Sequence, residues 1–429
     1  MRGKNRVKSR RKQHADKPKA EPSVVNHPIW DSSIPRLLCS KFAAIRFADA
    51  VEPALIADAV LFSSMFSKAM FLVDQCIISK TSGTAQTWFP PMLFDAAYLH
   101  AVCFTIQAYF DGCFTRTRSV EEQRRDYVHY AKAVRILQER LEAGDDRERL
   151  SDSTIMTVLA LSGHAYTTGD YESADNHSRG LLKLVGMRGV GAFLQNTKLL
   201  IEIIRCDLGM AVDGGSKPVL FTHDSVPWPL MLDSASPRTF LNKLDPELAA
   251  TWTAMSCFCS LLNEAADNEE KKITEEIFLH SMGSVMYRLL HQRFQKGSYD
   301  ETVRLGLLAF ASPIFLHWNR EEFPSHQFTC SYREALAMFY STGPDIERHE
   351  HVWLLMVGAL CMAHEQQPDD IAWLGPWLRT SAELNGVSSW DDMRDLLGSL
   401  LWVGVVYDKT GKEVFDLVCQ HNHQCREKK

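Results

Sequence analysis

The chain has 429 residues, of which 45% are hydrophobic and 23% are charged, and its formal net charge is −6. This composition is typical of a folded globular protein with a sizeable core. Because no run of about 18 uncharged apolar residues occurs, and no apolar stretch follows the basic N-terminus, the sequence predicts neither a membrane span nor a secretory signal.

The charge is unevenly distributed along the chain. Residues 1–20 hold nine Lys or Arg against one acidic residue, Asp16, whereas the rest of the chain holds 38 basic and 52 acidic residues. We expect the acidic body to repel DNA phosphates, so that only the basic tail is suited to a polyanion. Residues 1–50 are predicted to be a disordered basic tail and a proline-containing linker.

The tail contains a dense basic cluster, RGKNRVKSRRK. Three interpretations stay open: a nuclear localisation signal, an arm that contacts phosphates, and a plain solvated tail. The cluster has no aromatic residues that would stack on bases. Its basic residues are Arg2, Lys4, Arg6, Lys8, Arg10, Arg11 and Lys12.

Residues 51–425 predict an all-α body, built as an array of antiparallel helix hairpins with no significant β-sheet. Apolar residues recur at helical spacing, and turn-forming segments such as GGSKP and STGPD separate the runs. Residues 92–109 are apolar on nearly every side, which indicates a buried helix. Besides the hairpin described next, helices are predicted near residues 121–142, 193–212, 247–265, 273–294, 302–317, 331–340, 350–364, 389–406 and 411–420.

Residues 151–190 predict two helices joined by the very short turn TTGD. Ser151 is a candidate N-cap, and Asp152 places negative charge where the helix dipole favours it. Gly169 suits a left-handed position at the end of the first helix, and Asp170 suits the N-cap of the second. The segment G-D-Y-x-x-A also occurs in tetratricopeptide units, but the 34-residue recurrence that such an array requires is not visible in this sequence.

Several clusters carry potential metal-binding or catalytic side chains. His164 and His177 flank the hairpin turn, and packed histidines are favoured over a metal or acid–base pair because no acidic or cysteine partner stands at ligand spacing. CQHNHQC, residues 419–425, holds four zinc-type ligands but is too compact to surround one ion. No metal site is therefore predicted.

The cysteines and the known catalytic motifs give no sign of an enzyme. The eleven cysteines include no C-x-x-C pair, which favours reduced and mostly buried thiols, Cys257 and Cys259 among them. No Walker loop, no G-x-G-x-x-G after a strand and no G-x-S-x-G elbow is present. We therefore expect neither catalysis nor a cofactor.

Several segments, taken in order, resemble the regulatory domain of fungal-specific zinc-cluster transcription factors. HYAKAVRILQERL, residues 129–141, is similar to the family's H-x-x-x-A-x-R-x-L-x-x-R-L helix. Residues 150–189 contain L-S-D-x-T-I, then G-D, then H-x-x-G-L with His177 and Gly180, and then R-G, with Val190 in place of the family's next Gly. DLGMAVDGGSKPVLF, residues 207–221, is similar to a D…A…S-R-P run, with Lys217 in place of the Arg. The resemblance covers residues 90–420.

The resemblance implies a nuclear regulator of metabolic or secondary-metabolite genes. Its helical domain would bind other transcription proteins or a second copy of itself, and would sense a small-molecule effector between helices. Members of the family carry a C-x2-C-x6-C zinc cluster that reads DNA, and this spacing is missing among the cysteines here. A partial gene product and a member that reaches DNA only weakly, or through partners, both stay open. The alternative function is a helical interaction scaffold with no DNA role.

Overall fold

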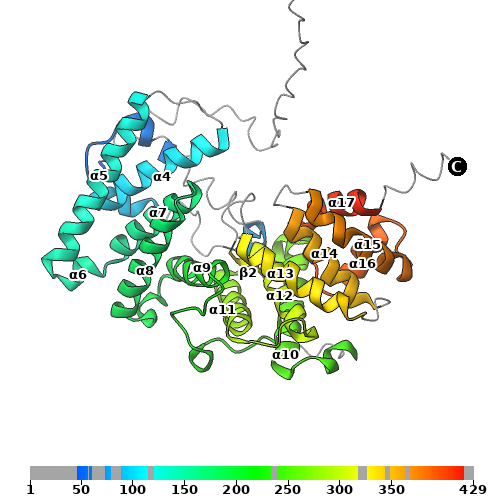
Figure 1. Cartoon of the computed structure of the whole chain (residues 1–429). Helices are drawn as coiled ribbons and strands as arrows, with labels where there is room; N and C mark the ends of the chain where they lie inside the picture. The colour runs from blue at the N-terminus through cyan, green and yellow to red at the C-terminus, as the bar shows by residue number, and fades with distance from the viewer. Residues whose placement is uncertain are drawn as a thin grey trace, which may run out of the picture. The chain divides into compact units, whose positions relative to one another are not determined.

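Helices account for nearly all the regular structure in the described part of the chain (Figure 1). The prediction of an all-α fold is confirmed. Two strands of two residues each, β1 (Ile77–Ile78) and β2 (Ile273–Thr274), pair in parallel. The computed structural model describes residues 46–56, 58–59, 73–78, 88–114, 120–232, 239–316, 326–343, 348–363 and 368–419, all within one compact unit, Ile45–Lys429.

Short 3-10 segments lie between some of the α-helices. The described elements are η1 (Asp74–Cys76), η2 (Pro90–Leu93), α4 (Ala96–Phe114), α5 (Val120–Ala143), α6 (Asp146–Arg149), α7 (Asp152–Thr167), α8 (Tyr171–Arg188), η3 (Val190–Phe193), α9 (Thr197–Asp213), η4 (His223–Ser225), η5 (Thr239–Lys243), α10 (Pro246–Asp267), η6 (Glu269–Lys271), α11 (Glu275–His291), α12 (Tyr299–Phe315), α13 (His326–Ser341), α14 (His349–Ala363), α15 (Pro368–Leu384), α16 (Trp390–Gly398) and α17 (Gly404–Cys419).

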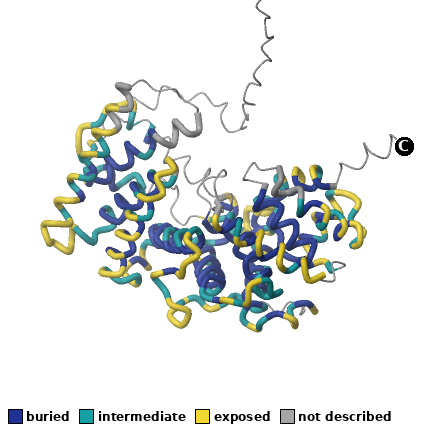
Figure 2. Tube along the Cα trace, in the orientation of Figure 1, coloured by how far each residue is buried: buried dark blue, intermediate teal, exposed yellow. Residues whose placement is uncertain are grey.

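Neighbouring helices pack in a chain of close pairs. α4 packs against α5 and α7, α7 packs along α8, and α8 contacts α9. Further along, α9 contacts α11, α12 contacts α13 and α14, and α14 packs against α15 and α17. α12 and α14 are buried over almost their whole length, which explains why their sequences are mostly apolar (Figure 2).

The predicted helix over residues 92–109 begins later and ends later than expected. Pro90 and Pro91 lack backbone N–H groups and start the 3-10 turn η2. Asp95 then accepts a hydrogen bond from the backbone N–H of Tyr98 at 3.0 Å, and α4 begins at Ala96. The apolar run therefore begins inside the 3-10 turn η2, and hydrophobic periodicity alone does not distinguish this turn from the helix that follows.

The sequence did not predict the four-residue helix α6 or the much longer helix α15. The centre of α15 carries Gly375 and Pro376, and proline disfavours a helix interior because it removes one hydrogen bond of the ladder. Tertiary packing compensates for this cost: Leu374, Leu378 and Ala382 are buried, and Pro376 is exposed. The helix exists because one face packs against α14 and α17.

The predicted helix over residues 389–406 is wrong, because the chain breaks between α16 and α17. Residues 400–403 are all buried, so the apolar pattern runs through the break without a signal. Asn263 of α10 bonds both sides of it: its Nδ2 donates to the carbonyl of Trp402 at 2.8 Å, and its Oδ1 accepts from the N–H of Gly404 at 3.1 Å. Trp353 Nε1 also donates to the carbonyl of Leu401 at 2.8 Å.

The end of the predicted linker contacts the helical body. The ring of Phe47 lies 5.9 Å from that of Phe89, and the N–H of Ala48 donates to the carbonyl of Met92 at 3.1 Å. Residues 1–45 lie outside the described residues, so the predicted disorder of the tail stays a prediction.

Candidate functional site

Two segments that the sequence analysis weighed as possible sites lie outside the described part of the chain. One is the basic cluster Arg2, Lys4, Arg6, Lys8, Arg10, Arg11 and Lys12. The other is the ligand-rich segment after Cys419, residues 420–425. The import and phosphate-contact interpretations of the first segment therefore stay as predictions, and the expectation that the second holds no metal ion stays untested.

The α7–α8 hairpin is held by its own capping residues. Ser151 Oγ accepts from the N–H of Thr154 at 3.2 Å, and Asp170 Oδ1 accepts from the N–H of Ser173 at 3.1 Å. Gly169 has a φ of +75°, in the left-handed region that favours glycine. A left-handed turn followed at once by a capped helix lets α7 reverse directly into α8.

Asp152 and Arg188 close the other end of the hairpin. Arg188 Nη1 donates to Asp152 Oδ1 at 2.6 Å and to the carbonyl of Leu150 at 3.0 Å. Asn196 Nδ2 donates to the second carboxylate oxygen at 3.1 Å, and the Arg188 guanidinium lies 4.3 Å from the ring centroid of Phe193. The sequence placed Asp152 only at a helix N-terminus, so this contact over 36 residues was not foreseen.

His164 of the hairpin packs against an aromatic ring of α4. The ring of His164 lies 3.9 Å from that of Phe104, and burial lowers the pKa of His164 to about 4. Burial also lowers the pKa of His177, which is half-buried. Gly180 is exposed, and nothing approaches the position of a Cβ there. Within the described residues, no three His, Cys, Asp or Glu side chains are placed to hold a metal ion.

A buried carboxylate anchors the segment after α9. Asp207 accepts hydrogen bonds from the N–H of Val219 at 2.7 Å, from the N–H of Leu220 at 3.0 Å and from the hydroxyl of Tyr287 at 2.8 Å. Burial raises the pKa of Asp207. Asp207 opens the D…A…S-R-P-like run, and Lys217, which replaces the family's Arg, is exposed. Asp207, the first residue of this run, thus forms hydrogen bonds with the backbone near its last residues.

A chain of hydrogen bonds that the sequence did not reveal connects three elements. His100 Nε2 lies 2.9 Å from Asp49 Oδ2, and His100 Nδ1 lies 2.8 Å from His129 Nδ1. Lys132 Nζ donates to the same carboxylate oxygen at 3.0 Å. His100 is fully buried, and burial lowers its pKa. These hydrogen bonds join α4 and α5 to Asp49, at the end of the predicted linker.

The thiols also differ in part from expectation. The described cysteines form no disulfide, and burial raises the pKa values of Cys103 and Cys206 to about 12. Cys259 is buried as predicted, but Cys257 is partly exposed. The residues at 257 and 259 are two positions apart on a helix and so face different directions.

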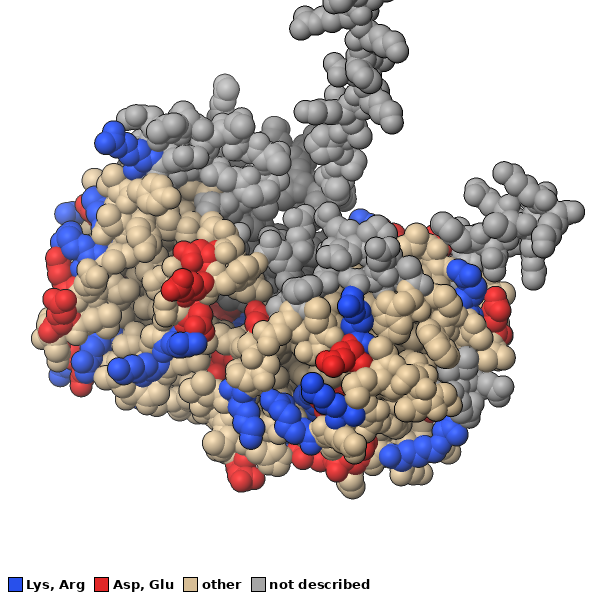
Figure 3. All heavy atoms as spheres, viewed as in Figure 1, with Lys and Arg blue, Asp and Glu red and all other residues tan. Residues whose placement is uncertain are grey.

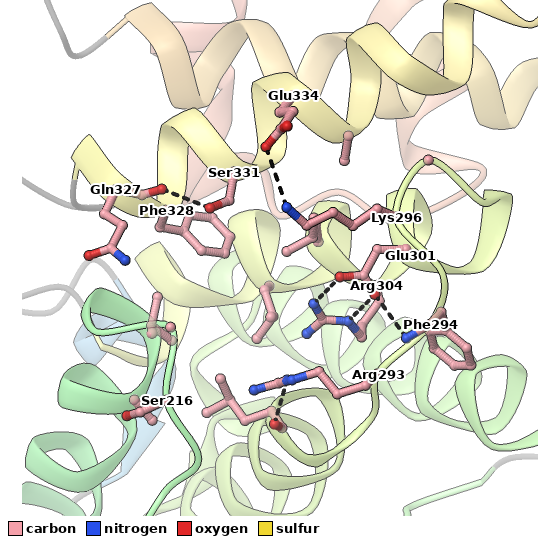
Figure 4. Close-up of a pocket in the computed structure, with 18 of the residues that line it drawn as sticks. Ser216, Arg293, Phe294, Lys296, Glu301, Arg304, Gln327, Phe328, Ser331 and Glu334 are labelled. Carbon is pink, nitrogen blue, oxygen red and sulfur yellow. Dashed lines mark hydrogen bonds and ion pairs between the residues drawn. The ribbon is translucent and has the colours of Figure 1, made fainter.

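A cavity of about 330 Å³ lies between α9, α11, α12 and α13 (Figure 4). Its floor holds a buried ion pair: Arg304 donates through Nε to Glu301 Oε2 at 2.8 Å and through Nη2 to Oε1 at 2.6 Å. Its rim carries Lys296 and Glu334, whose charged atoms lie 3.9 Å apart. Apolar side chains from three of the helices complete the wall: Leu290, Leu305, Leu308, Phe328, Ala335 and Met338.

Arg293 is the remaining cation of this pocket. Its Nη1 donates to the carbonyls of Leu290 at 2.8 Å and Gln292 at 3.0 Å. In Figure 4 its guanidinium lies below that of Arg304 and on the same side of the cavity. Burial, and then the charge of Arg304, lower the pKa of Arg293. Ligand pockets in proteins typically combine an apolar wall with a few polar or charged groups, and this cavity has both. No sequence motif pointed to it, because its residues come from separate elements.

The described surface and helices add two observations. On the face drawn in Figure 3, Lys and Arg side chains alternate with Asp and Glu rather than forming a field of one sign. Of the helices that the structure describes, none is both long and apolar enough to cross a bilayer. Comparison with protein-family models, curated proteins and solved structures finds no match for this chain.

Proposed function

We propose that this protein is a transcriptional regulator whose helical body acts as a regulatory domain of the fungal zinc-cluster type. The observation that carries the proposal is the Asp152–Arg188 contact at 2.6 Å. Asp152 belongs to the L-S-D motif and Arg188 to the R-G motif of the stretch that resembles the family. If the sequence similarity were due to chance, there would be no reason for the L-S-D and R-G motifs at its two ends to contact each other.

Other letters of the same stretch also have structural roles. Ser151 and Asp170 cap the two helices, and Gly169 supplies the left-handed turn between them. These polar and glycine positions are ones that a related fold would need at the same spacing. They support the proposed resemblance, and the regulatory function comes from that resemblance.

The proposed division of labour follows the distribution of charge. The tail, residues 1–20, would carry the protein into the nucleus and add weak, salt-sensitive contact with DNA phosphates. The acidic body would bind other transcription proteins or a second copy of the chain. The regulated genes would be metabolic or secondary-metabolite genes.

Two measurements test the proposal. A fluorescent fusion of the full chain should accumulate in the nucleus, and replacing Arg2, Lys4, Arg6, Lys8, Arg10, Arg11 and Lys12 with Gln should disperse it. The matched control replaces seven exposed Lys or Arg residues of the body. Chromatin immunoprecipitation of the full chain should recover a limited set of promoters. A nuclear protein that recovers no promoter would instead be an interaction scaffold, and the regulator proposal would fail.

A further inference from the structure

We propose that the cavity between α9, α11, α12 and α13 binds a small anionic amphiphile, namely a carboxylate on a short apolar body. As an effector site, this inference rests on the proposed function; as a binding site, it rests on the cavity alone. Its volume of about 330 Å³ lies at the lower end of the range for small-molecule pockets.

The charges that line the cavity do not balance. Three cations, Arg293, Lys296 and Arg304, face two carboxylates, Glu301 and Glu334. Both oxygens of Glu301 are already bonded to Arg304, and Glu334 lies 3.9 Å from Lys296. The excess charge therefore resides on Arg293.

Arg293 forms no ion pair within the described part of the chain. Its Nη1 is bonded to two carbonyls at the end of α11, whereas Nε and Nη2 have no described acceptor. The two free nitrogens form the planar edge that guanidinium groups present to a carboxylate. Burial and then the neighbouring charge of Arg304 lower the pKa of Arg293, and an anion bound at Arg293 would offset that charge.

The apolar wall determines the rest of the ligand. Leu305 and Leu308 are buried on α12, and Phe328, buried on α13, lines the same cavity. An apolar chain or ring held against these side chains would leave water while its carboxylate stays at Arg293. A purely hydrophilic anion would not use this wall, and a neutral or cationic amphiphile would not use Arg293.

The test is isothermal titration calorimetry of the full chain with three eight-carbon probes: octanoate, octan-1-ol and octylammonium. Octanoate should bind at least about tenfold more tightly than either of the others, because only it forms a charge-assisted pair with Arg293. Octan-1-ol or octylammonium binding as tightly as octanoate would overturn the proposal, as would the absence of octanoate binding at millimolar concentration.

Variants locate the binding site. Arg293→Gln should weaken octanoate binding by about tenfold or more. Because Arg293 also bonds the end of α11, Ser331→Trp provides an independent variant: Ser331 is exposed and lines the cavity, so the indole should fill it and abolish binding. Arg179→Gln removes an exposed cation on α8 and should bind octanoate like the parent chain. Unchanged binding in both Arg293→Gln and Ser331→Trp would overturn the assignment.

The binding test and the test of function fail separately. Calorimetry uses purified protein and depends neither on nuclear import nor on DNA. Loss of octanoate binding with retained promoter occupancy would remove the ligand inference alone. Retained binding by a protein that recovers no promoter would leave a ligand-binding scaffold.

Discussion

The α7–α8 turn and the α16–α17 break are both short interruptions between helices, yet they are specified differently. At the first, Gly169 has a φ of +75° and Asp170 caps the next helix, so residues of the turn itself end one helix and start the other. At the second, an amide from α10 bonds the carbonyl of Trp402 and the N–H of Gly404. A junction specified by its own residues can be predicted from the sequence, whereas a junction specified by a residue far away in the sequence cannot.

The comparison predicts different costs of substitution. A local cap or glycine contributes one hydrogen bond or relieves one strained dihedral pair, while Asn263 satisfies two backbone groups at once. We therefore expect the distant contact to contribute more to stability than any single local one.

The largest effect is expected for Asn263→Leu. Two backbone groups of the α16–α17 break would lose their partner, which should lower the free energy of unfolding by about 3 kcal/mol. Urea denaturation followed by circular dichroism measures this loss. The control is Asn268→Ala, which removes the exposed N-cap of η6 directly after α10. It should lower the free energy of unfolding by less than about 1 kcal/mol. Equal losses of unfolding free energy in the two variants would contradict the expectation that the distant contact contributes more than a local cap.

A pH dependence is expected at the hairpin, whose buried surface includes His164. The folded pKa of about 4 lies below the ordinary value of 6.5, so the unfolded chain takes up the proton first. Neutral His164 contributes fully to the free energy of unfolding above pH 6.5, and this contribution is lost as the pH falls toward 4. Because the ring is partly exposed and screened by solvent, the loss should be about 2 kcal/mol. His164→Gln should flatten this slope.

His223 provides the matched control for that measurement. Hydrogen bonds to Asp224 and Glu247 raise its pKa, so its contribution is present below pH 6.5 and is lost as the pH rises. His223→Gln should therefore leave the acid-side slope intact. A slope unchanged by His164→Gln would show that other groups cause it.

Gly169→Val tests the local turn directly. A β-branched residue resists positive φ, so the free energy of unfolding should fall by about 1.5 kcal/mol. Gly180→Ala is the control, because Gly180 lies within α8 with open space around it. That change should leave stability unaltered or raise it by up to about 1 kcal/mol. Wild-type thermal stability in Gly169→Val would show that the turn does not need glycine.

Ser151→Ala removes the N-cap of α7. The N–H of Thr154 would lose its acceptor, at a cost of about 1 kcal/mol. Ser260→Ala, an exposed serine within α10, should change stability by less than about 0.5 kcal/mol. Chemical denaturation of both variants would separate a capping effect from general loss of a hydroxyl.

The smallest effect is expected for the Asp152–Arg188 pair. Both side chains are partly exposed, so a double-mutant cycle with Asp152→Asn and Arg188→Gln should give a coupling of about 0.5–1 kcal/mol. Zero coupling would mean that the two motifs meet without stabilising each other, and would remove the main support for the proposed resemblance.

Helices and their first residues could be predicted from the sequence where one apolar helix face or one capping residue specifies them. The periodic residues around Leu137 and Leu181 predicted helices that the structure contains, and Ser151 and Asp170 marked two helix starts. Prediction from the sequence failed at α15, where Pro376 argues against a helix that packing stabilises. It also failed at the pocket, because Arg293, Arg304 and Phe328 come from three elements with no shared pattern.

The sequence by itself determined that the chain is helical, where the α7–α8 hairpin turns, and that the first 20 residues carry a net positive charge while the rest of the chain is acidic. These properties depend on periodicity, capping and composition, which act over a few residues. Only the tertiary structure decided where α16 ends, which carboxylate holds Arg188, and which cations surround the cavity. Those features depend on side chains that are far apart in sequence and meet only when the helices pack.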